Sequence, residues 1–262
     1  MDSAFYVSDG DRFVSSDLTR GPWDPDSQHA GPPAALIARE LERMDPDSEW
    51  QIGRITFEIL KPVPIAPLAI HTEIVRPGKS VQLLTASLSS EEGEVIRASA
   101  WRLARRELEL PAGIERGERE IPGPEQAQEE EVFATGQDVG YHTAMEYRFV
   151  SGRFLEAGPA TVWMRMRYPL VEGEEPTPLQ RVLAAADSGN GVSATLDWSR
   201  YLFINVDLSV HLHRLPAGEW VCLDAITIPE PDGVGLADTA LYDEAGSLGR
   251  ALQTLLVRAR EA

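Results

Sequence analysis

The 262-residue sequence contains one cysteine, Cys222, and no long uninterrupted apolar run. One cysteine cannot form an intramolecular disulfide or a cysteine-based zinc site and is typical of a reducing compartment, so we expect a cytoplasmic protein. A membrane-spanning helix needs about 18 or more consecutive apolar residues, so no membrane span is expected. The N-terminal segment MDSAFYVSDGDRFV has neither the basic start nor the apolar core of a signal peptide.

Basic residues are also scarce, because 24 Lys and Arg face 42 Asp and Glu, for a formal net charge of −18. Nucleic-acid binding draws most of its affinity from neutralising phosphates, so this charge argues against a nucleic-acid partner. A small phosphorylated ligand needs only a few local cations and stays compatible with it. The apolar fraction of 43% is ample for a core, and the length fits one large domain or two smaller units.

The most polar stretch, residues 106–131, carries three prolines and a cluster of glutamates without apolar periodicity. Such a stretch is typical of an exposed linker or of a segment that wraps an edge. Segments of similar order lie on either side of it. We therefore expect an N-terminal unit at residues 1–106, an acidic linker at 107–139 and a C-terminal unit at 140–262.

The two units repeat one another at an offset of 153 residues. ITFEILK (55–61) falls on LSVHLHR (208–214), and RASAWRLAR (97–105) falls on RALQTLLVR (250–258). Apolar positions and turns coincide without a gap across about fifty residues, which indicates a structural duplication. Each copy has long strands rich in Val, Ile, Thr and aromatic residues.

One helix is expected in each copy, at residues 36–44 and 179–187. A single helix can cover a sheet of five or six strands only if the sheet curls around it, which describes the hotdog fold. We therefore predict an α+β fold, a double hotdog of two tandem units, each an antiparallel sheet curled around one long helix.

The second helix carries a carboxylate on its apolar stripe. Leu179, Val182, Leu183 and Ala186 follow the i, i+3, i+4, i+7 spacing of a buried helix face, and Asp187 comes next. A buried carboxylate is costly unless it is paired, hydrogen-bonded or protonated. Either the helix ends before Asp187 or this carboxylate has a functional role.

Over nearly its whole length the sequence resembles the acyl-CoA thioesterase family of the TesB type, in which two hotdog units are fused in one chain. The motifs that carry the resemblance are HAGPPAAL (29–36), LKPVP (60–64), VRPGKS (75–80), AAAD (184–187), VDLSVHLHR (206–214) and LQTLLV (252–257). The most specific of them is the spacing of Asp207, Ser209, His213 and Arg214.

The resemblance implies a hydrolase of acyl-CoA, without a cofactor, whose water is positioned by a helix aspartate, a strand threonine or serine and a late-strand glutamine. On this chain the aspartate is Asp187 and the glutamine is Gln253, whereas the hydroxyl position falls on Asn205. An amide can still hold a water or a carboxylate, because it has donors and an acceptor. The repeat counterparts of the three residues are Ala34, Ile52 and Ala100. A polar trio in only one copy indicates a single site.

The position of Asn205 raises a geometric difficulty. Ile204, Val206 and Leu208 alternate on one strand face, and Asn205 lies on the opposite face. If the helix packs on the apolar face, Asn205 points away from Asp187 unless a bulge intervenes. The two faces could instead meet at the seam between the units.

In this mechanism Asp187 acts as general base, and the oxygen that becomes negative needs hydrogen-bond donors. A helix N-terminus offers unpaired N–H groups. Gly31 and His29, in the segment HAGPP that leads into the first helix, are the candidates for binding this oxygen, since the two prolines have no N–H. Alternatively, Gly31 only permits a close approach of helix to sheet.

The phosphates of CoA need cations, and four basic residues near strand ends or turns are candidates: Lys61, Arg76, Lys79 and Arg214. Arg214 and its repeat counterpart Lys61 are the better pair, because each adjoins a proline-containing turn. His211 and His213 alternate on a strand and could face a metal ion, but no cysteine or glutamate cluster completes a ligand set, so no metal is expected.

Two other functions stay open. A non-catalytic acyl- or acyl-CoA-binding hotdog protein would fit the change to Asn205. Hotdog hydratases and dehydratases of acyl-CoA resemble one another in pairing an aspartate with a histidine five residues later, a position that Val192 occupies here. Hotdog units generally pair through their sheets, so we also expect a homodimer of the whole chain.

Overall fold

In the computed structural model the described residues are 3–45, 49–114, 119–130 and 135–260. The N-terminal half contains β1 (Tyr6–Asp9), β2 (Arg12–Ser15), η1 (Asp17–Thr19), α1 (Gly31–Arg43), β3 (Trp50–Ile59), β4 (Pro67–Arg76), β5 (Val81–Ser90) and β6 (Gly93–Ala104). The C-terminal half contains η2 (Pro124–Gln126), β7 (Gln128–Glu129), α2 (Tyr141–Ala144), β8 (Met145–Ser151), β9 (Ala160–Met166), α3 (Pro178–Ala186), α4 (Gly189–Val192), β10 (Tyr201–Asn205), β11 (Asp207–Leu212), β12 (Val221–Pro229), β13 (Val234–Asp243) and β14 (Gly246–Ala259).

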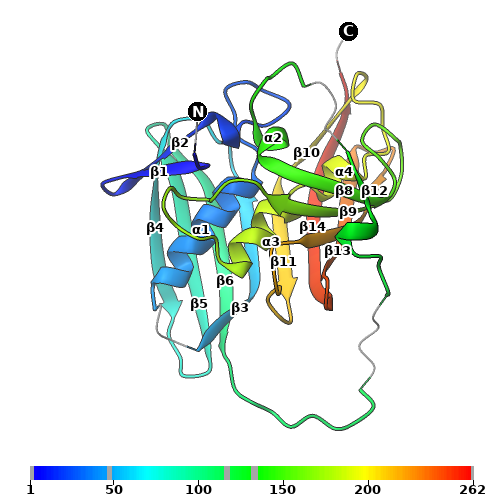
Figure 1. Cartoon of the computed structure of the whole chain (residues 1–262). Coiled ribbons are helices and arrows are strands. Elements are labelled where there is room, and N and C mark those ends of the chain that lie inside the picture. Colours follow the sequence, from blue (N-terminus) through cyan, green and yellow to red (C-terminus); the bar gives the residue numbers. More distant parts are fainter. Residues whose placement is uncertain (1–2, 46–48, 115–118, 131–134, 261–262) are drawn as a thin grey trace.

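All the strands belong to one antiparallel sheet, in the order β1-β2-β4-β5-β6-β3-β11-β14-β13-β12-β9-β8-β7, with β10 beside β14. The two helices α1 and α3 lie side by side against one face of this sheet (Figure 1). The predicted double hotdog is therefore confirmed. None of the described helices has the length and hydropathy that a membrane crossing requires.

The two halves join between β3 and β11, on an axis of approximate two-fold symmetry. Thr56 lies opposite Ser209, and their hydroxyl oxygens are 2.8 Å apart. These two residues are repeat counterparts, separated by 153 positions. The pairs on either side, Glu58 with Asp207 and Arg54 with His211, exchange with one another under the same offset. The residues that the sequence repeat relates are thus the residues that the two-fold axis relates at the junction.

The two helices meet on the same axis. A Cβ atom added at Gly31, the first residue of α1, would lie 2.3 Å from the carbonyl oxygen of Ala184 in α3. These residues are again counterparts at the 153-residue offset. Small residues at a crossing let two helix backbones approach closely. The alternative role considered for Gly31, close approach, is therefore what the packing demands, although its contact is a helix rather than a strand.

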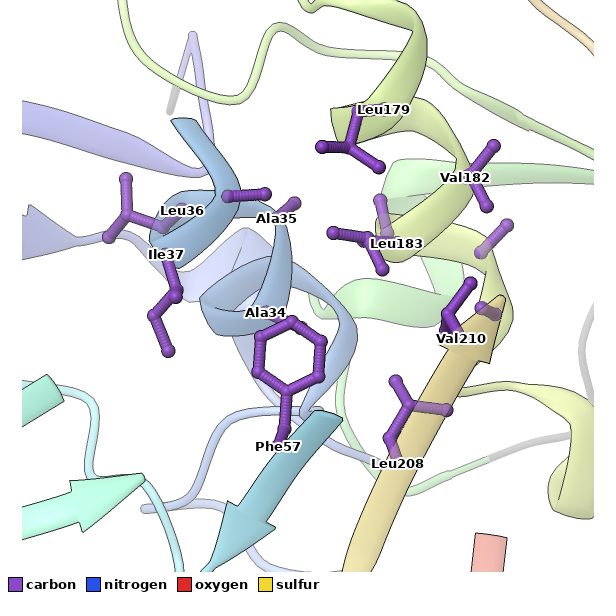
Figure 2. Packing of buried hydrophobic residues seen from close by; sticks show 14 of the residues in the cluster. Ala34, Ala35, Leu36, Ile37, Phe57, Leu179, Val182, Leu183, Leu208 and Val210 are labelled. Atoms are coloured by element: carbon purple, nitrogen blue, oxygen red, sulfur yellow. The ribbon is translucent and has the colours of Figure 1, made fainter. Parts of the chain in front are cut away.

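The core lies between the helices and the sheet and spans both halves. Figure 2 shows Ala34, Ala35, Leu36 and Ile37 of α1 beside Leu179, Val182 and Leu183 of α3, with Phe57 of β3 and Leu208 and Val210 of β11 below them. The first helix begins at Gly31, five residues before the predicted range of 36–44. Prolines at the start of a helix cost no hydrogen bond, because the first N–H groups have no partner within the helix.

The predicted linker at 107–139 is described only in part, because residues 115–118 and 131–134 lie outside the described residues. Two of its described segments contact the C-terminal half. Trp163 donates from Nε1 to the carbonyl of Pro122 at 2.8 Å, and Gln128–Glu129 pairs with β8. The three-part division of the chain stays a prediction.

Candidate active site

Asp187 lies immediately after α3, at its C-terminal cap, and its side chain is only 5% exposed. Oδ1 accepts hydrogen bonds from Asn205 Nδ2 at 2.9 Å and from Gln253 Nε2 at 3.1 Å. Of the two alternatives raised by the sequence, the end of the helix before Asp187 is confirmed, since α3 ends at Ala186. The functional role of the carboxylate stays a prediction. The three residues singled out from the sequence are in direct contact.

A bulge at Val206 turns Asn205 toward Asp187. Asn205 lies opposite Leu255 of β14, whereas Ser209 lies opposite Leu252, so the strand gains one residue over its partner between these pairs. The extra residue reverses which face of the sheet each following side chain points to. Val206 is therefore 45% exposed although Leu208 is 1% exposed.

The same irregularity occurs in the other half. The register between β3 and β6 shifts between Ile52 and Arg54, around Gly53, which is the repeat counterpart of Val206. The bulge therefore belongs to the duplicated unit. The alternation in the sequence requires such a bulge for Asn205 to face Asp187 on the helix side of the sheet.

Gln253 is held at both ends of its side chain. Its Nε2 donates to the side chain and to the backbone carbonyl of Asp187, both at 3.1 Å, and its Oε1 accepts from the N–H of Asn190 at 3.1 Å. This fixes the amide so that its donor faces the carboxylate. The short helix α4 that supplies Asn190 has too few residues to give a periodic sequence signal.

His29 contacts the other carboxylate oxygen, with its Nδ1 3.1 Å from Asp187 Oδ2. The imidazole lies flat on the Tyr141 ring, at 3.7 Å between centroids and 7° between planes. Tyr141 is fixed in turn, since its hydroxyl donates to the carbonyl of Ala184 at 2.7 Å and lies 2.9 Å from Ser188 Oγ. Sequence reasoning missed Tyr141, because nothing local distinguishes it from a core tyrosine.

Burial lowers the pKa of His29 below its ordinary value of 6.5, and the nearby Asp187 carboxylate opposes that shift. The folded state then binds fewer protons at this histidine than the unfolded chain does, so stability falls as the pH drops below about 6.5. We expect His29→Asn to lose less stability than the wild type between neutral and mildly acidic pH. Urea unfolding across this range measures the effect.

His71→Asn is the matched control for this experiment, because His71 is exposed on β4. Its pH dependence should follow the wild type. Equal acid losses for His29→Asn and the wild type would contradict the proposed burial cost.

The expectation that Gly31 offers a free N–H needs correction. Its N–H donates to His29 Nδ1 at 3.2 Å, and Gly31 is absent from the cavity wall described below. The helix crossing with Ala184 holds the residue inside the structure instead. Nδ1 cannot accept from Gly31 while it donates a proton to Asp187, so the tautomer of His29 decides which contact is a hydrogen bond.

A cavity of about 520 Å³ extends from Asp187, His29 and Asn205 to the surface. Its wall includes apolar and aromatic side chains from both halves: Ile59, Val63, Tyr147, Phe154, Trp198 and Phe203. Trp23 and Trp198, which also line it, stack across the seam with ring centroids 4.0 Å apart. An apolar chamber with convergent polar groups at one end is typical of a small-molecule site.

Of the four cations proposed for CoA, the structure places one at this cavity. Lys61 lines it, whereas Arg76, Lys79 and Arg214 do not. Arg214 Nη1 instead pairs with the buried Asp243 at 2.6 Å, and Arg76 lies over the Trp101 ring at 5.7 Å. Arg260 is a cation of the cavity wall that the sequence reasoning missed.

The equivalent position in the other half holds no polar group. The counterparts Ala34, Ile52 and Ala100 are all buried, and Val182 stands at the counterpart of His29. The histidine and the aspartate of the site come from different halves, so the site forms where the two halves meet. In the described part of the chain no group of three or more His, Cys, Asp or Glu side chains could hold a metal ion.

Comparisons with known proteins agree with this architecture. Models of the acyl-CoA thioesterase N-terminal and C-terminal domains match residues 19–103 and 122–257. No curated protein sequence matches the chain.

Solved structures resemble it at low sequence identity. A presumed thioesterase II from Thermobifida fusca has 17% identity and a TM-score of 0.75, with coverage of 99% of this chain and 96% of that one. An acyl-CoA thioesterase II, TesB2, from Mycobacterium marinum has 15% identity and a TM-score of 0.61, with coverage of 97% and 94%. At these identities the likeness shows the fold, whereas the two domain models show the family. The chain therefore belongs to the TesB-type acyl-CoA thioesterases, hydrolases of the hotdog superfamily.

Proposed function

We propose that Asp187 is the general base of acyl-CoA hydrolysis and that Asn205 and Gln253 orient the carboxylate and the attacking water. The observation that supports this most directly is the convergence of two amide donors on Oδ1, at 2.9 and 3.1 Å. With Oδ1 occupied, Oδ2 is the oxygen that faces His29 and has a further lone pair for a water. A carboxylate so held is pre-oriented for proton transfer.

The burial of the site serves this chemistry. Burial keeps bulk water away from the carboxylate, and the two amides supply the hydrogen bonds that Oδ1 would otherwise make to water. The apolar wall of the cavity offers space for an acyl chain, and Lys61 and Arg260 on that wall are the candidates to meet the phosphates of CoA.

Asn205→Ala should lower kcat by about tenfold, because it deletes one of the two donors that orient the carboxylate. Asn205→Thr restores a donor in the form that the family carries at this position, and we expect it to regain most of the lost rate. Release of free thiol from a series of acyl-CoA chain lengths measures both variants. Unchanged turnover in Asn205→Ala would exclude a role for this amide.

One observation favours a second candidate, the hydration of an enoyl-CoA. The chain lacks a histidine five residues after Asp187, but the fold supplies His29 from the other half at 3.1 Å. Aspartate–histidine pairs of this kind can add water across a double bond. Loss of enoyl absorbance without thiol release would identify hydration, and thiol release from saturated acyl-CoA identifies hydrolysis.

A further inference from the structure

The strand β10 has an open edge inside the cavity. Among the residues that the structure describes, its one strand partner is β14. Every residue from Tyr201 to Val206 lines the cavity, which includes both faces of the strand. A cavity that touches both faces of one strand must run along its edge.

Residues 59–63, on the opposite side of the cavity, cannot pair with the open edge of β10. Ile59 donates its N–H to the carbonyl of Val206 at 2.9 Å, and there the backbone pairing between the strands of the two halves ends. The N–H of Leu60 turns to Val95 at 3.0 Å, and Pro62 has no N–H to offer. The sheet therefore splits beyond Val206, and the slot between β10 and residues 59–63 leads to Asp187.

Two backbone N–H groups point into this slot. Val257 donates to Gly233, away from β10, so Phe203, which lies opposite Val257, directs its own backbone groups away from β14. Asn205 has the same orientation, because residues two apart on a strand share an edge. The carbonyl of Phe203 already accepts from Asn190 Nδ2 at 3.4 Å, another cavity-lining residue. Neither N–H has a hydrogen-bond partner among the residues that the structure describes.

We propose that this edge binds the thioester unit of the substrate, and the assignment rests on the proposed function for its chemistry. The N–H of Asn205 donates to the thioester carbonyl, and the N–H of Phe203 donates to the nearest amide carbonyl of the pantetheine arm. Asn205 is the residue whose side chain holds Asp187. Its N–H therefore supplies the donor for the oxygen that becomes negative, the role from which the packing removes Gly31.

The spacing supports this assignment. Donors two residues apart on one strand edge are separated by about 6.7 Å. Five bonds separate the thioester carbonyl carbon from the first amide carbonyl carbon, an extended span of about 6.5 Å from ordinary bond lengths. The strand edge thus binds two carbonyl groups, that of the thioester and that of the first amide. Every acyl-pantetheine thioester contains this pair. Recognition of the pantetheine arm is then independent of the length of the acyl chain.

The first test compares two small thioesters of the same acid, one of N-acetylcysteamine and one of butanethiol, which lacks the amide. Wild type should prefer the former in kcat/KM by about tenfold, the worth of one good hydrogen bond. Phe203→Pro removes the aromatic ring together with an N–H that faces away from the ladder, and it should abolish the preference. Phe203→Ala also removes the ring but keeps the N–H, so it should retain the preference. An equal preference in the two variants, or none in the wild type, would overturn the assignment.

The second test does not depend on catalysis. The dethia analogue of hexanoyl-N-acetylcysteamine, with a methylene in place of sulfur, keeps both carbonyls and cannot be hydrolysed. Its binding to the wild-type protein should slow amide hydrogen exchange at Phe203 and Asn205 and leave Leu202 and Ile204, which face β14, unchanged. Unaltered exchange at Phe203 and Asn205 under a saturating concentration would refute the edge site. Failure of the general-base proposal would appear instead as hydrolysis that survives the loss of Asp187.

Discussion

Asp187→Asn should reduce kcat for acyl-CoA hydrolysis by about a thousandfold, because an amide cannot accept the proton of the attacking water. The fold should persist. The new side-chain oxygen can still accept from Asn205 and Gln253, and the new NH₂ can donate to His29 Nδ1. Removal of a buried charge costs no stability when its hydrogen bonds are kept. Thiol release measures the rate, and urea unfolding measures the stability.

Glu58→Gln is the control for Asp187→Asn, because it makes the same chemical change on an exposed side chain of the neighbouring strand β3. It should leave the rate unchanged. A variant lacking the Asp187 carboxylate that turns over at the wild-type rate would eliminate the general base from the mechanism. A variant that is inactive and also unfolded would show that Asp187 is needed for structure instead.

Gly31→Ala should lower the free energy of unfolding by about 3 kcal/mol, at the upper end of overpacking costs. The added Cβ would lie 2.3 Å from the carbonyl oxygen of Ala184, so α1 and α3 must separate. The contact is with backbone, which cannot move aside as a flexible side chain can. Since His29 precedes α1 and Asp187 follows α3, the separation should also lower activity.

Gly191→Ala is the matched substitution, since a Cβ at this position in α4 meets nothing within 4 Å. It should alter stability little. Urea unfolding of both variants gives the comparison, and equal stabilities would contradict the tight helix crossing.

Much of the site was accessible from sequence. The apolar stripe of the second helix drew attention to Asp187, and the family resemblance supplied Gln253 and Asn205. The apolar counterparts of all three residues in the other copy indicated a single site. In the structure the side chains of Asn205 and Gln253 both donate to the carboxylate of Asp187. The homodimer and the cytoplasmic location stay predictions.

The assignment of phosphate-binding cations worked less well. Arg214 and Lys61 are equivalent by sequence, but only Lys61 lines the cavity. The difference comes from Asp243, which pairs with Arg214 from a strand about thirty positions away and has Ser90 as its repeat counterpart. A local motif does not reveal such a partner, because the pairing of strands decides it.

By itself the sequence determined the duplication, the register of the two halves and the identity of the buried carboxylate, since periodicity and internal comparison are local and repeated signals. Only the tertiary structure decided that the strand bulges at Val206, that His29 meets Asp187 across the seam and that Gly31 lies at the helix crossing, away from the cavity wall. Each of these depends on the distance between segments far apart in the chain. Packing of the two helices and pairing of the strands set that distance, and neither is encoded within a single stretch of sequence.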